Sequence, residues 1–201
     1  MDTREIIKQY CEVIDDIYGI YLDATKGFID NKTQLEVSQL DSINKLSVTL
    51  EYLDSIPFAY GVGDPNISSS YVLHRCTQGE YKIRNDKDGK NFATLGNLCI
   101  TQLYQYWEDF YRTQIAKSVG LKKNDLNIDI FGDLRLFRHS IIHHQAIALI
   151  EIEQCKEFCW FKKGDKINLT ERQIEEIIYL LKKEMDILAN KFVAKGFDYL
   201  Q

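Results

Sequence analysis

The residue types best suited to acid–base and phosphate chemistry gather in one short stretch in the second half of the chain. Three of the four histidines, His139, His143 and His144, fall within six residues, and Arg135 and Arg138 precede them. An imidazole changes charge near neutral pH and can therefore give or take a proton. A guanidinium offers a fixed fork of donors to phosphate oxygens. This combination is suited to the cleavage of a phosphate ester such as RNA.

The apolar spacing around these residues predicts a helix over residues 128–145. On a wheel of about 100° per residue, His139 and His143 lie one turn apart and share a face close to Arg135. Arg138 falls inside the apolar arc, where a guanidinium needs a partner, a route to solvent or an interface. The arc itself is predicted from Phe131, Leu134, Phe137, Ile141 and Ile142.

The run Arg138-His-Ser-Ile-Ile-His143 resembles the Arg-x4-His motif of the HEPN superfamily (higher eukaryote and prokaryote nucleotide-binding domains). In that motif a polar residue, most often Asn, follows the arginine, and here the position is His139. The resemblance implies a compact helical bundle that often dimerises. Many members are metal-independent endoribonucleases whose site forms where two motif helices meet.

Carried over to this chain, the resemblance implies that Arg138 holds the scissile phosphate and that His143 is the acid or base. His139 would orient the phosphate or His143, while Arg135 and His144 match no fixed motif position and are interpreted as supporting contacts. The expected products are a 2′,3′-cyclic phosphate and a 5′-hydroxyl. No cofactor and no metal site is predicted, because the zinc-protease pattern His-Glu-x-x-His is absent: Ser140 follows His139.

Three hypotheses follow. The first is a HEPN-type endoribonuclease that acts in a toxin–antitoxin pair or in antiviral defence (abortive infection). Its expected partners are RNA, a second copy of the chain through the motif helix, and an antitoxin or other regulatory protein. The second is a non-catalytic HEPN-like module that binds nucleotide, RNA or a partner protein. The third is a purely structural helical protein, in which Arg138 pairs with a glutamate of the first or last helix.

The composition indicates a globular chain and limits its partners. The 201 residues carry 25 Lys and Arg against 30 Asp and Glu, a net charge of −5, and 45% are hydrophobic. This acidic balance argues against a protein that coats nucleic acid through bulk electrostatics. No apolar run of membrane-spanning length and no secretory leader are present, so a cytoplasmic protein with no membrane contact is expected. The five cysteines are expected to be reduced thiols.

The motif must be positioned by other helices, and the apolar spacing predicts an all-α fold with one HEPN-like domain over residues 1–201. The bundle is expected to contain four to five long helices. A break at Asn31 or Lys32 predicts that the first two form an antiparallel hairpin. The predicted helices cover Thr3–Asp30, Thr33–Ser55, Ala93–Val119, Ile128–Gln145 and Thr170–Lys195.

Two segments do not follow the helical pattern. Residues 56–92 are rich in turn residues and predict a loop-rich insertion, with short strands at Tyr71–His74 and Glu80–Ile83. This insertion is interpreted as a solvated loop or as a lid that contacts phosphate. Residues 147–166 combine apolar and aromatic residues with a Lys-Gly-Asp turn, which predicts a small β hairpin.

Overall fold

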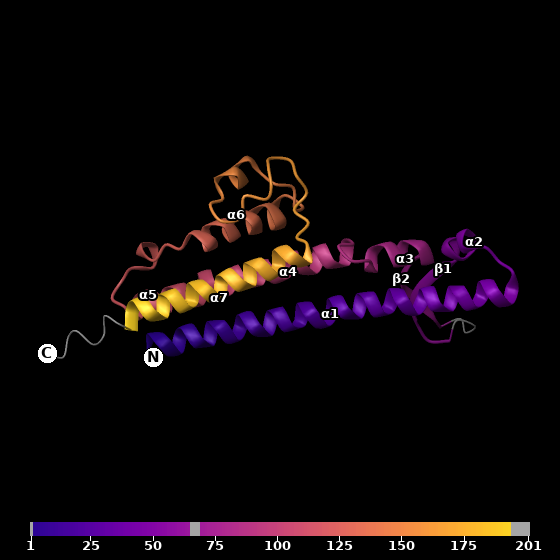
Figure 1. Ribbon diagram of the computed structural model, residues 1–201, viewed down its shortest axis with the longest axis horizontal. Helices are drawn as coiled ribbons and strands as arrows, with labels where there is room; N and C mark the ends of the chain where they lie inside the picture. The colour runs from indigo at the N-terminus through magenta and orange to yellow at the C-terminus, as the bar shows by residue number, and fades with distance from the viewer. Residues whose placement is uncertain (1, 65–68, 194–201) are drawn as a thin grey trace. The chain divides into compact units, whose positions relative to one another are not determined.

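The computed structural model describes residues 2–64 and 69–193 (Figure 1). Of these residues 71% are in helices and 8% in strands, so the all-α prediction is confirmed as far as a mostly helical fold. The chain packs as two compact units. One comprises the residues up to Leu22 together with those from Ala93 onward, and the other is Asp23–Phe92. No helix within the described ranges is long and apolar enough to cross a lipid bilayer.

The first helix, α1 (Thr3–Leu46), is continuous, and the predicted break at Asn31 or Lys32 is wrong. Ion pairs one turn apart stabilise the helix on both sides of that point: Lys26 binds Asp30 at 2.7 Å, and Lys32 lies 3.8 Å from Glu36. No proline interrupts the backbone there. The predicted helical hairpin is therefore replaced by one long helix.

The second predicted helix contributes only a short separate element. After α1, Ser47 adopts a positive φ of 54° and ends the helix. A new helix, α2 (Leu50–Ser55), begins where the Thr49 hydroxyl accepts a hydrogen bond of 3.2 Å from the backbone N–H of Tyr52.

Within the described residues of this segment, 56–64 and 69–92, regular elements replace much of the predicted loop. Strands β1 (Pro57–Val62) and β2 (Tyr71–Thr77) pair antiparallel, which confirms the strand predicted at Tyr71–His74. The strand predicted at Glu80–Ile83 is wrong, because helix α3 (Gln78–Asn85) occupies it. Thr77 and Glu80 form a reciprocal capping box that begins this helix.

A partly buried polar network ties α1, α2 and α3 together in this unit. The Gln39 amide donates to Asp54 and to Gln78 at 2.9 Å each, and it accepts from Lys82 at 2.9 Å. Lys82 also binds the Asp54 carboxylate at 2.7 Å. The hydrogen bond from Lys82 lowers the pKa of Asp54 below its ordinary value, against a smaller opposing effect of burial.

We expect the unit Asp23–Phe92 to lose stability as the pH falls below about 4. A carboxyl whose pKa is lowered on folding contributes stability above its unfolded pKa and loses it as protons bind. Amide hydrogen exchange of α2 and α3 between pH 5 and pH 2.5 measures this loss. In Asp54→Asn the loss should be smaller over the same interval. An equal loss in the variant and the wild type would contradict the role given to Asp54.

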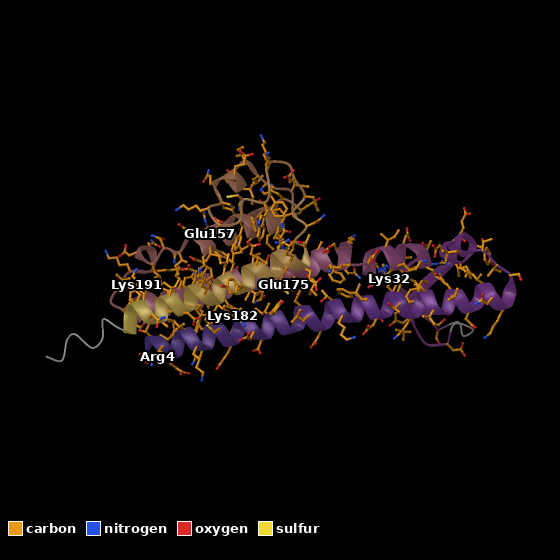
Figure 2. All side chains as sticks on the ribbon, viewed as in Figure 1. Arg4, Lys32, Glu157, Glu175, Lys182 and Lys191 are labelled. Carbon is orange, nitrogen blue, oxygen red and sulfur yellow. The ribbon has the colours of Figure 1, made fainter. Side chains whose placement is uncertain are left out.

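The other unit is built on the first part of α1 and three further helical segments. Helix α4 (Lys90–Tyr106) continues through a π-helical turn, η1 (Trp107–Tyr111), into α5 (Arg112–Ser118), and α6 (Asp129–His143) and α7 (Glu171–Val193) follow. The helices predicted over these regions are confirmed, although the predicted end of the last helix at residues 194 and 195 lies outside the described residues. Lys182 of α7, labelled in Figure 2, binds the Asp15 carboxylate of α1.

Aromatic rings form the centre of this unit. Trp107 stacks on Phe131 with ring centroids 3.8 Å apart and planes within 4°. Tyr10 of α1 packs against Trp107 at 5.6 Å and against Tyr111 at 4.8 Å. These contacts fix the π-helical turn and the first turns of α6 in one core.

The segment after α6 does not form the predicted hairpin at residues 147–166. It contains a 3-10 helix, η3 (Ile150–Gln154), and a single antiparallel bridge between Ile147 and Lys166. Figure 1 shows this segment folded back over α6. Its aromatic residues are used for packing on the helix rather than for strand pairing, since Phe137 of α6 contacts Phe158 and Phe161.

A buried carboxylate of α6 holds this segment in place. Asp133 is 2% exposed and accepts backbone hydrogen bonds from Lys156 (3.0 and 3.1 Å), Glu157 (2.7 Å) and Phe158 (2.8 Å). Both of its oxygens are used, so the charge is compensated by three peptide donors. Glu157, labelled in Figure 2, marks the position of this turn beside α6.

Candidate functional site

The face that α6 buries determines which of its side chains are free. Ile130, Phe131, Leu134 and Phe137 are buried. Ile142, which the wheel placed in the buried arc, is instead 49% exposed. The buried arc therefore narrows toward the end of the helix, where Ile142, His143 and His144 are exposed. Arg135, His139 and His143 therefore lie on the exposed side.

The last turn of α6 brings three histidines together, as their spacing predicts. The ring centroids of His139 and His143 are 5.1 Å apart, and those of His139 and His144 are 5.5 Å apart. All three side chains are exposed. Three imidazoles thus share one small patch of exposed surface.

A constrained turn fixes the end of this helix. Gln145 and Ala146 both adopt a positive φ, 52° and 61°, a backbone conformation that residues other than glycine rarely adopt. Hydrogen bonds hold this backbone: the Ala146 N–H donates to the Ser140 carbonyl at 3.0 Å, and the Ile167 N–H donates to the Ala146 carbonyl at 2.7 Å. Such strain persists only where the surroundings over-determine it, and it is concentrated at functional sites.

Arg138 is half-buried on the same helix and has no ion-pair partner among the described residues. Its Nε is shielded from solvent and makes no hydrogen bond there. The ion pair with a glutamate of the first or last helix, expected if the motif were structural, is therefore not formed in the described part of the chain. Leaving a buried donor unpaired costs about 1–3 kcal/mol, so this position is unfavourable for an arginine that has no further partner.

A cavity of about 570 Å³ lies beside the first half of α6, and the sequence did not predict it. The π-helical turn contributes Glu108, Arg112 follows that turn, and α6 contributes Gly132 and Arg135. Further lining residues are Tyr104, Trp107, Leu126, Asn127, Ile128, Asp129, Phe131, Asp133, Leu136, Gln154 and Lys156. A π-helical turn often occurs at a functional site because it redirects side chains, and its position cannot be recognised from apolar spacing.

The carboxylates of this cavity already have partners. Glu108 binds Arg112 at 2.9 Å and Lys123 at 2.7 Å. Burial alone would raise the pKa of Glu108, but the hydrogen bonds from Lys123 and Arg112 lower it overall. Asp129 pairs with Lys156 at 2.7 Å, and Asp133 is held by peptide donors.

Arg135 is the cation of the lining that makes no ion pair and no hydrogen bond within the described part of the chain. Its charge acts on the phenol of Tyr104, whose pKa burial raises in spite of the opposing charges of Arg135, Arg112 and Arg138. Arg135 therefore presents an unpaired guanidinium to the cavity.

Comparison with models of protein families, with curated proteins and with solved structures found no match. The assignment of function therefore depends on α6 and on what surrounds it. Within residues 2–64 and 69–193, no group of three or more His, Cys, Asp or Glu side chains is arranged to hold a metal ion.

Proposed function

We propose that this chain is a metal-independent endoribonuclease of the HEPN type that acts in a toxin pair or in antiviral defence. The observation that carries the proposal is the half-buried Arg138 guanidinium, which has no carboxylate partner in the described structure and is followed on the same helix by three clustered imidazoles. A phosphate diester supplies the negative charge that this guanidinium lacks.

In this mechanism Arg138 holds the oxygens of the scissile phosphate. His143 removes the proton of the adjacent 2′-hydroxyl, and that oxygen attacks the phosphorus. The bond to the 5′-oxygen breaks, and a protonated imidazole gives that oxygen its proton. The products are a 2′,3′-cyclic phosphate and a 5′-hydroxyl. His139, whose ring lies beside that of His143, orients the phosphate or His143.

A second copy of the chain completes this site in the proposal. Ile142 is exposed and lies four residues after Arg138, on the same face of α6. An apolar side chain beside a half-buried guanidinium is suited to an interface with a second motif helix. The two copies then supply separate imidazoles for the base and the acid. A regulatory partner such as an antitoxin would keep the activity from harming the host.

Cleavage of a mixed cellular RNA in EDTA tests the proposal. Wild-type protein should cut RNA without metal and leave cyclic phosphate ends, and Arg138→Ala should not. Metal-dependent cutting, or equal cutting by the variant, would contradict it. Binding of RNA without cleavage by the wild type would favour a non-catalytic HEPN-like binding module instead.

A further inference from the structure

We propose that the cavity beside α6 binds a nucleotide of the RNA that flanks the cleaved bond, with a phosphate of that strand on Arg135. The inference rests on the proposed function, because it takes the histidine cluster as the place of cleavage. It assigns substrate recognition to residues outside the Arg138–His143 motif.

The cavity and the histidines lie along one side of the same helix. Gly132, Arg135, His139 and His143 follow one another at intervals of three or four residues, so they form one continuous face of α6. Arg135 comes eight residues before His143, which is about 12 Å along the helix axis. A short piece of single-stranded RNA can cover this span. A strand cut at the histidines therefore passes the mouth of the cavity.

The charges of the cavity favour an anionic ligand over a cationic one. Its three carboxylates, Glu108, Asp129 and Asp133, are each held by cations or by peptide donors. The guanidinium of Arg135, by contrast, has no ion-pair partner among the described residues. A cationic ligand would have to displace existing ion pairs, whereas a phosphate needs only Arg135, which binds it with two parallel donors.

The size and the remaining polar groups suit a nucleobase. About 570 Å³ lies within the range of pockets that bind small organic ligands. The side-chain amide of the exposed Gln154 makes no hydrogen bond among the residues described, and it can both donate to and accept from a base edge. The buried stack of Trp107 and Phe131 closes the cavity on the core side.

Gly132 lies in the lining of the cavity, where a substitution can test whether the cavity is used. A Cβ atom built at this position meets no atom within 4 Å, so a side chain there enters open space rather than the core. Gly132→Leu should therefore fill part of the cavity while the helix stays intact. Gly132→Ala is the matched control, because it adds the same backbone constraint and only one methyl group.

The experiment measures RNA binding separately from cleavage. Four fluorescein-labelled hexanucleotides, of adenylate, cytidylate, guanylate or uridylate, are titrated in EDTA against full-length His143→Ala protein, and anisotropy is recorded. At least one of them should bind. Gly132→Leu and Arg135→Ala should each weaken that binding by at least about tenfold, and Gly132→Ala by less than about twofold. Thermal unfolding confirms that each variant is folded. If Gly132→Leu does not fold, the binding measured for Arg135→Ala, a change at an exposed residue, tests the proposal alone.

The outcomes separate this inference from the proposed function. Unchanged binding in Gly132→Leu and Arg135→Ala, or no binding of any hexanucleotide, overturns the cavity assignment, even if wild-type protein still cleaves RNA. Binding that depends on Gly132 and Arg135, in a protein whose wild type never cleaves RNA, supports the cavity and overturns the ribonuclease.

Discussion

Replacing His143 by alanine is expected to lower the rate of RNA cleavage by about 100- to 10,000-fold, the usual contribution of a positioned acid or base. The imidazole of His143 lies on the exposed last turn of α6, so its removal should leave the fold intact. RNA binding should change by less than about threefold, because the proposed phosphate-binding residues Arg138 and Arg135 are unchanged. Single-turnover cleavage and RNA-binding titrations measure the two quantities independently.

His74→Ala is the matched control for this experiment. His74 is the one histidine outside the cluster and lies on β2 in the unit Asp23–Phe92. The His74→Ala protein should cleave RNA at the wild-type rate. A similar loss in both variants would mean that the effect is not specific to α6. Full activity in His143→Ala would remove His143 from the reaction.

Asp133→Ala is expected to destabilise the protein by about 3 kcal/mol, which lowers Tm by about 6–12 °C for a chain of this size. The substitution leaves the peptide donors of Lys156, Glu157 and Phe158 without their acceptor. Because those donors anchor the segment after α6, its amides should also exchange faster. Differential scanning calorimetry and hydrogen exchange give the two results.

Asp129→Asn separates this effect from a general loss of charge on α6. Asp129 pairs with the Lys156 side chain at 2.7 Å, but both side chains are more than half exposed. Exposed ion pairs contribute little to stability, so Tm should fall by only a few degrees. If the two variants lose equal stability, the backbone contacts of Asp133 are not what holds the segment.

The sequence predicted what depends on short-range spacing. The helix that carries Arg138 and the histidines was predicted to within two residues at each end, because its apolar residues recur at helical intervals. The clustering of His139, His143 and His144 follows from the same geometry.

The features that the sequence did not predict depend on distant partners. Asp133 contacts peptide groups 23 to 25 residues later, so nothing in its neighbourhood indicates that it is buried. Strand β1 contains Pro57 and Gly61, which are disfavoured in strands, so its sequence does not predict one. The strand forms through its pairing with β2. The predicted break in α1 failed because turn-prone residues are tolerated where ion pairs join successive turns. The cavity is lined by three segments that are separated in the sequence, so no local pattern indicates it.

The positive-φ backbone of Gln145 and Ala146 has a consequence for the rate of the reaction proposed on α6. The final turn of a helix ordinarily frays, and groups placed there spend part of their time away from any productive geometry. Here two hydrogen-bonded positive-φ residues close the end of the helix against Ser140 and Ile167. In the proposed reaction, the order that RNA would otherwise have to impose on His143 and His144 is supplied when the chain folds, which lowers the entropic part of the barrier.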